Sequence, residues 1–276
     1  MGELRENALS NCAFIRSISL SDGITEIGKK AFYECRNLET IVIPETVTKI
    51  GPRAFEHSGL KSIILPYQSK GLTEIDGCAF YKCKNLETII IPKTVTKIDP
   101  YAFALSGLKS IILPDGLTEI RNGAFYGCNK LESVVIPETV TKIGPNAFAV
   151  SELKSIILPY QSKGLTEIGS NAFLSCSNLE TVAIPDSVIR IDPRAFAYSG
   201  LKSITLSDGL TEIGEEAFYN CRNLETVVIP ETVTKIGPHA FTNSGLKSII
   251  LPDERLTEIG EDAFFNCSNL VLKYRN

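Results

Sequence analysis

Hydrophobic positions along the chain fall into short runs, each closed by proline or glycine. Within residues 38–44, Ile41 and Ile43 are two positions apart, the spacing of side chains on one face of a strand, and a proline ends the run. Residues 47–50 form a second short extended run. Because proline costs little at the first position of a helix, residues 52–55 predict a short helical turn with an alanine and a phenylalanine on its buried side.

This pattern recurs along the whole chain. An Ala-Phe pair returns every 22 to 25 residues, and Leu9 fills the same place at the start. We therefore predict one domain over residues 1–276, built of about twelve units of 22–25 residues. The recurring phenylalanines are Phe32, Phe55, Phe80, Phe103, Phe125, Phe148, Phe173, Phe196, Phe218, Phe241 and Phe264.

A single unit cannot bury its apolar side, whereas stacked units share a continuous core. The pattern therefore predicts a repeat solenoid. We expect a parallel β-sheet on its concave face, and second short strands with short helical turns on the other side. Neighbouring strands would lie about 4.8 Å apart, which makes the body long and narrow.

Two kinds of unit alternate. Cys-type units, such as residues 32–38, place a cysteine three residues after the phenylalanine and reach the next leucine in six residues. Ser-Gly units, such as residues 55–60, place Ser-Gly there and take five. The first unit is a hybrid that carries Cys12. A longer repeat is also visible, because residues 67–71 recur as residues 160–164, which indicates that a block of four units was duplicated.

Charge alternates with the unit type in two columns. In a parallel stack each charge would face opposite charges, and a slip by one unit would set like charges together. The alternation therefore predicts in-register stacking rather than a charged ligand. The first column reads Arg16, Glu39, Lys61, Glu87, Lys109, Glu132, Lys154, Glu180, Lys202, Glu225, Lys247. The second reads Glu26, Lys49, Glu74, Lys97, Glu119, Lys142, Glu167, Arg190, Glu212, Lys235, Glu258.

The phrase Leu-x-x-Ile-x-Ile-Pro-x-x-Val-Thr-x-Ile-Gly-x-x-Ala-Phe-x-x-Cys resembles the BspA-like leucine-rich repeat family. It runs nearly intact through residues 38–55 and 224–241, with the cysteine supplied by neighbouring units at Cys35 and Cys221. The resemblance implies a leucine-rich-repeat solenoid, secreted or displayed on a cell surface, that binds host matrix or cell-surface proteins as an adhesin. It offers no catalytic residues to carry over.

Outward-facing aliphatic residues form the strongest candidate binding surface. One strand position, which we call the aliphatic column, is predicted to line the exposed concave sheet, with a Ser/Thr column beside it. Exposed apolar stripes mark interfaces, although β-branched ladders also simply stabilise strand stacking. A second, less favoured face is the aromatic column of Tyr33, Tyr81, Tyr126, Leu174, Tyr219 and Phe265. The candidate protein-binding residues of the aliphatic column are Val42, Ile64, Ile90, Ile112, Val135, Ile157, Val228 and Ile250.

Composition narrows the function classes. The net charge of −4 does not suggest a nucleic-acid partner, and the apolar runs are too short for membrane insertion. The sequence has no nucleotide-binding loop, nucleophile elbow or metal-binding helix motif, so we expect a non-enzymatic protein without catalytic or metal residues and without cofactors.

Eight cysteines are present, and seven occupy one repeat position. Most are two units apart, about 10 Å, which is too far for a disulfide. Cys12 and Cys35 are the exception, because they lie in adjacent units. We expect the column to consist of buried thiols that act as small hydrophobic groups.

The two ends of the array differ. The chain opens inside a repeat, which predicts an uncapped N-terminal end. We expect either that the chain is a fragment of a longer surface protein or that a partner covers this end. At the other end, residues 270–276 suggest a modest polar cap, with Lys273 in the place of Val227. The concave face and the uncapped N-terminal end are candidate surfaces for self-association. The competing interpretation of the whole chain is a passive structural spacer, and a consensus-like designed array is a remote alternative.

Overall fold

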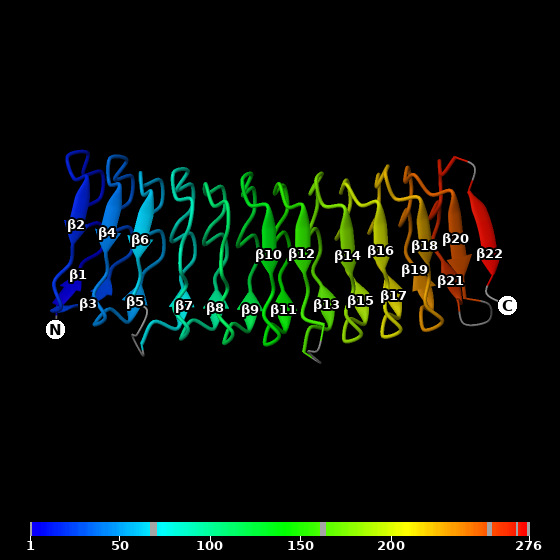
Figure 1. The fold of residues 1–276 in the computed structure, drawn as a ribbon, viewed down its shortest axis with the longest axis horizontal. Coiled ribbons are helices and arrows are strands. Elements are labelled where there is room, and N and C mark those ends of the chain that lie inside the picture. Colours follow the sequence, from blue (N-terminus) through cyan, green and yellow to red (C-terminus); the bar gives the residue numbers. More distant parts are fainter. Residues whose placement is uncertain (1, 67–70, 161–163, 253–255, 269, 275–276) are drawn as a thin grey trace.

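The fold is a stack of short coils, most of which contribute one strand to each of two parallel sheets. It is a computed structural model that describes residues 2–66, 71–160, 164–252, 256–268 and 270–274. Figure 1 shows the strands in two rows along a long body, with the termini at opposite ends. From β1 to β21 the chain completes eleven coils, and the twelfth unit ends in β22. The predicted solenoid and its repeat length are confirmed.

The broad sheet is the one predicted for the concave face, and its strands are mostly three residues long. Pairing runs in three stretches, β2-β4-β6, β10-β12-β14-β16 and β18-β20-β22, with single bridges Ile90↔Ile112 and Ser110↔Ser133 in the region between β6 and β10. Its strands are β2 (Ser17–Ser19), β4 (Thr40–Val42), β6 (Ser62–Ile64), β10 (Ser133–Val135), β12 (Ser155–Ile157), β14 (Thr181–Ala183), β16 (Ser203–Thr205), β18 (Thr226–Val228), β20 (Ser248–Leu251) and β22 (Val271–Tyr274).

The narrow sheet, made mostly of two-residue strands, lies along the other row of Figure 1. It pairs as β1-β3-β5 and as the continuous run from β7 to β21. Its strands are β1 (Gly2–Leu4), β3 (Ile24–Ile27), β5 (Lys49–Ile50), β7 (Glu74–Ile75), β8 (Lys97–Ile98), β9 (Glu119–Ile120), β11 (Lys142–Ile143), β13 (Glu167–Ile168), β15 (Arg190–Ile191), β17 (Glu212–Ile213), β19 (Lys235–Ile236) and β21 (Glu258–Ile259).

The predicted helical turns are wrong, because the described residues contain tandem β-turns in their place. The Ala54 N–H donates to the Gly51 carbonyl across a turn in which Pro52 is the second residue and Arg53 has φ 59°. This is the type II pattern, which favours proline in that place. The Arg53 N–H then donates to the Gly77 carbonyl of the next coil. Proline signals the start of a helix and a type II turn equally well, which explains the wrong prediction.

Left-handed residues recur two positions before and two positions after each phenylalanine. Most of them are not glycine, and they include Leu105 (φ 57°), Val150 (φ 59°) and Tyr198 (φ 58°). Such residues resist positive φ, most strongly when they are β-branched or bulky. The conformation persists because the left-handed residues from Asn7 to Asn243 each donate a backbone hydrogen bond to the next coil, so the stack holds these turns in place.

Phenylalanines form a buried column, which we call the phenylalanine column, along the turn side of the core. Successive rings from Phe32 to Phe264 stack with centroids 5.1–5.6 Å apart and planes within 13° of parallel. The rings from Phe32 to Phe241 are fully buried. Burying one such side chain contributes about 1.5–3 kcal/mol, so this column is a main source of stability.

The register agrees with the charge alternation. In the narrow sheet Glu167 pairs with Arg190 and Arg190 with Glu212. Beside the broad sheet, five lysines each form an ion pair with the glutamate of the preceding unit, as Lys154 does with Glu132 at 3.1 Å. In-register stacking is thus confirmed.

The last strand departs from the predicted alignment by one residue. Leu272, not Lys273, pairs with Ile249 and so continues the core column of Val227, while Lys273 pairs with the outward-facing Ile250. Leu272 is 48% exposed, so the predicted polar cap does not cover the core at this end. The duplicated segments at 67–70 and 161–163 lie outside the described residues.

Candidate protein-binding surface

The aliphatic column lies where the sequence places it, on the outer face of the broad sheet. Val42 pairs with Ile64, Ile90 with Ile112, and Val135 with Ile157. Strand geometry turns these side chains away from the core, because their neighbours Ile41 and Ile63 point inward and are at most 7% exposed. Exposure along the column is 41% for Val42, 63% for Ile64 and Ile90, 75% for Ile112, 60% for Val135 and Ile157, and 47% for Val228. Ile250 is half-buried.

The column is continuous in the N-terminal half and interrupted further on. From Val42 to Ile157 every coil contributes an isoleucine or valine, whereas the next two coils contribute Ala183 and Thr205. Hydroxyl groups flank the column throughout. Most of the adjoining Ser/Thr column is exposed: Ser17, Thr40, Ser62, Thr88, Ser110, Ser133, Ser155, Thr181, Ser203 and Thr226, with Ser248 half-buried. The surface therefore combines an apolar stripe with small groups that can donate and accept hydrogen bonds.

The aromatic column is a weaker candidate. Tyr33, Tyr81 and Tyr126 are half-buried, and the His57 ring packs edge-on between Tyr33 and Tyr81 with centroids 6.3 and 6.0 Å away. These rings already pack against one another over the turns. Phe265 is 60% exposed, so this column offers little open aromatic surface except at the C-terminal end.

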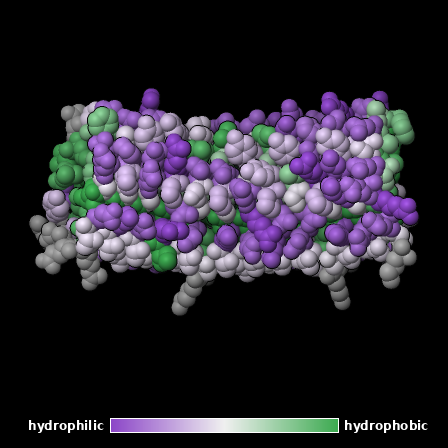
Figure 2. All heavy atoms as spheres, turned by 180° about the vertical axis from the view of Figure 1, so that it is seen from behind, coloured by the Kyte–Doolittle hydropathy of each residue, from purple (hydrophilic) through white to green (hydrophobic). Residues whose placement is uncertain are grey.

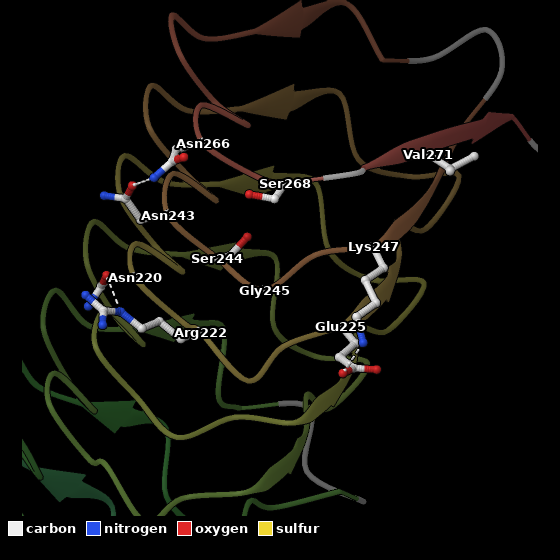
Figure 3. Close-up of a pocket in the computed structure, with 10 residues that line it drawn as sticks. All are labelled: Asn220, Arg222, Glu225, Asn243, Ser244, Gly245, Lys247, Asn266, Ser268 and Val271. Atoms are coloured by element: carbon white, nitrogen blue, oxygen red, sulfur yellow. Dashed lines mark hydrogen bonds and ion pairs between the residues drawn. The ribbon is translucent and has the colours of Figure 1, made fainter.

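A shallow groove follows the edge between the turns and the broad sheet, and Figure 3 shows its C-terminal part. Six of the polar side chains in this part pair with one another. Lys247 Nζ lies 2.5 Å from Glu225 Oε1, Asn266 Nδ2 donates to Asn243 Oδ1 at 2.8 Å, and Arg222 Nε donates to Asn220 Oδ1 at 3.1 Å. The groove therefore has less to offer a partner than the aliphatic column has.

Along this groove the Ser-Gly units pass close to the coil before them. A Cβ added at Gly59 would overlap the carbonyl oxygen of Arg36, and the same holds for Gly107, Gly200 and Gly245 against the matching residue. Glycine is needed for this close approach rather than for an unusual φ. Glu152 replaces it once and accepts a hydrogen bond from Asn178.

Four of the buried cysteines have thiols of low reactivity. Burial raises the pKa of the Cys128 and Cys176 thiols to about 11 and that of Cys83 and Cys221 to about 12. A thiol with so high a pKa is almost wholly protonated near neutral pH and is a poor nucleophile. The prediction of buried thiols holds for these four and for Cys35, whereas Cys12, Cys78 and Cys267 are half-buried.

Three carboxylates meet beside the narrow sheet. One oxygen each of Glu74, Asp76 and Asp99 lies within 4.8 Å of the other two. Burial, followed by repulsion from Asp99 and Glu74, raises the pKa of Asp76 to about 6. Arg121 Nη1 lies 2.6 Å from Asp99 Oδ1. The Arg121 guanidinium offsets part of the negative charge of this cluster.

Figure 2 shows one long face of the molecule, on which hydrophilic residues cover most of the body and hydrophobic residues gather at the C-terminal end. The exposed Val271, Leu272 and Tyr274 belong to this end. In the described part of the chain, no helix has the length and hydropathy needed to cross a bilayer.

Stacked coils with leucine, isoleucine and phenylalanine columns under a parallel sheet define a leucine-rich repeat protein. The BspA type leucine rich repeat region matches residues 2–103, 73–202 and 160–271 in six copies. The chain belongs to this family, a group of repeat scaffolds, and no enzyme family is indicated.

Solved structures agree with this assignment. A leucine rich cell surface protein of Faecalibacterium prausnitzii A2-165 is 31% identical, with a TM-score of 0.57 over 100% of this chain and 83% of that one. The pneumococcal vaccine antigen PcpA is 21% identical, with a TM-score of 0.61 over 96% of this chain and 80% of that one, and so shares the fold. No curated protein sequence matches the chain.

Proposed function

We propose that this chain is a non-enzymatic protein-binding scaffold whose partner docks on the aliphatic column. The observation that carries the proposal is the exposure of Ile64, Ile90 and Ile112 at 63–75%, although each packs against its neighbours along the sheet. Strand stacking accounts for the choice of β-branched residues but leaves most of each side chain in water. A contiguous apolar stripe in water is what protein interfaces use.

The partner we propose is a host matrix or cell-surface protein, and the scaffold is secreted or displayed on a cell surface as an adhesin. Membership of the BspA type family and the 31% identical cell surface protein support this setting. The stripe is one side chain wide and many coils long, which suits an extended apolar segment laid along the solenoid. The flanking hydroxyls would bond the polar groups of such a segment.

Loss of the stripe tests the proposal. The variant Ile90→Ser/Ile112→Ser/Ile157→Ser should lose at least tenfold in affinity for immobilised extracellular-matrix proteins, because three apolar contacts of about 1 kcal/mol or more disappear. Binding is measured by surface plasmon resonance, and stability by thermal unfolding. The melting temperature should fall only slightly, since these side chains are already largely in water.

The matched control is Ile189→Ser, which removes an aliphatic side chain that is 48% exposed away from the column. It should bind as the wild type does. Equal binding by the triple variant would overturn the docking site. If the wild type binds none of the matrix proteins and remains monomeric in sedimentation, the spacer interpretation is favoured instead.

A further inference from the structure

A repeated contact between a thiol and a hydroxyl joins each Cys-type unit to the Ser-Gly unit before it. The cysteine sulfur lies 3.2–3.5 Å from the serine oxygen of the preceding coil in five places. In the same five places the thiol also donates to the carbonyl of the preceding phenylalanine at 3.0–3.2 Å. The pairs are Ser58–Cys83, Ser106–Cys128, Ser151–Cys176, Ser199–Cys221 and Ser244–Cys267.

The first two coils repeat this arrangement with one change, because Cys12 stands in the serine place. Cys12 follows Leu9 by three residues, as Ser58 follows Phe55, and the Cys35 thiol donates to the Leu9 carbonyl at 2.9 Å. The Leu9 N–H bonds to the Ala31 carbonyl at 2.8 Å, so the two coils lie directly against each other. The repeat thus sets Cys12 opposite Cys35 in the serine place, and the Cys12 backbone hydrogen-bonds to Cys35 as the Ser58 backbone does to Cys83.

The spacing of the coils suits a covalent bond at this place. Adjacent parallel strands lie about 4.8 Å apart, within the Cα separation of about 4.4–6.8 Å that disulfides adopt. Like the serine–cysteine pairs, Cys12 and Cys35 lie on adjacent coils, whereas other cysteines in the same repeat position are two coils apart. We infer that Cys12 and Cys35 are a disulfide-forming pair that staples the first coil to the second under oxidising conditions.

Exchange with a small disulfide such as oxidised glutathione balances the reaction. The half-buried Cys12 thiolate attacks one sulfur of the reagent, forms a mixed disulfide and releases one glutathione thiol. The Cys35 thiolate then attacks the Cys12 sulfur and releases the second glutathione. Two protein thiols are oxidised, one reagent disulfide is reduced, and the two protons pass to the glutathione thiols. Burial raises the pKa of the Cys35 thiol, opposed by a hydrogen bond from the Cys12 backbone, which fits Cys35 as the second and slower nucleophile.

The test is peptide mapping of the folded chain after incubation with oxidised glutathione. We expect an intramolecular Cys12–Cys35 link and a mass lower by about 2 Da, the two hydrogens lost when one disulfide forms. Hydrogen exchange of residues 2–12 should become slower on oxidation and return to its original rate with dithiothreitol. A stable Cys12–glutathione adduct, a disulfide-linked dimer, or an unmodified pair would overturn the inference.

Two variants keep the result interpretable. Cys12→Ser restores the serine–cysteine contact found in five other places, so it should fold as the wild type does and form no link. In the wild type, Ser58 Oγ lies 3.3 Å from Cys83 Sγ. Ser58→Cys therefore places a second cysteine beside Cys83, and this pair should form the same kind of disulfide. If Ser58→Cys forms the link and the wild-type pair does not, the first coil departs from the repeat and the inference fails. If neither forms the link, the geometric premise itself is wrong.

Discussion

Two columns of side chains run along this solenoid with the same period, and they differ in what they contact. The phenylalanine column lies inside, stacked ring on ring and closed to water. The aliphatic column lies outside, with Ile112 three-quarters exposed. Repetition alone therefore does not separate core from interface, because both columns recur with the same period. What separates them is the environment, and each column should respond differently to substitution.

The largest difference should appear when one side chain of each column is truncated to alanine at neighbouring positions along the solenoid. Phe125→Ala should lower the free energy of unfolding by about 3–5 kcal/mol, because it leaves a cavity between two stacked rings. Ile112→Ala should lower it by less than about 1 kcal/mol, since most of that side chain is already in water. Urea unfolding followed by circular dichroism measures both. Comparable losses would mean that the aliphatic column belongs to the core.

A second prediction extends the aliphatic column instead of truncating it, by replacing the two residues that interrupt it. Ala183→Ile/Thr205→Ile would join the stretch that ends at Ile157 to the stretch that begins at Val228. Affinity for a matrix protein that the wild type binds should rise up to about tenfold, equivalent to about 1.4 kcal/mol. Surface plasmon resonance measures the change. Ala13→Ile/Ser21→Ile adds similar apolar area at exposed positions outside the column and should leave affinity unchanged.

The smallest expected effect is the pH dependence of stability. The coil interior has a titratable carboxyl group beside it, Asp76, whereas the aliphatic column has no titratable group. The pKa of Asp76 rises from 3.8 to about 6 on folding, so the folded state holds more protons between those values. Stability should therefore fall as pH rises from about 4 to about 6. Asp76→Asn should remove part of this fall and raise the melting temperature at pH 7 but not at pH 4.

Thermal unfolding at several pH values measures the Asp76 effect. Asp115→Asn, on an exposed turn, is the matched control and should leave the profile unchanged. Binding through the aliphatic column should stay constant over the same pH range in both variants. A pH profile that Asp76→Asn leaves intact would show that the cluster with Glu74 and Asp99 does not set it.

Much of this architecture follows from the sequence because the repeat supplies many copies of each position. The columns of Phe125 and Ile112 could be assigned to inside and outside from spacing alone, and the alternating charges gave the register. Two features could not. Val150 and Leu105 adopt left-handed conformations that their own preferences oppose, so only bonding between coils reveals the tandem turns. At Lys273 a one-residue shift of the last strand changed which side chain faces inward.

Neither the sequence nor the structure by itself assigns a binding role to the aliphatic column. Sequence identifies Ile64 and Ile90 as outward-facing, and the structure shows that they remain mostly in water. A partner is a property of two molecules, so its identity does not follow from the geometry of one.

The glycine of the Ser-Gly units has a consequence for how such an array can change its length. Gly59 and Gly107 let their coils pass the backbone of the preceding Cys-type coil, and Lys61 and Lys109 pair with glutamates of that same neighbour. Loss of a single unit would place two coils of one type together, with like charges adjacent in both charged columns. Genes for this protein should therefore gain or lose coding segments two units at a time, and the duplicated four-unit block obeys that arithmetic.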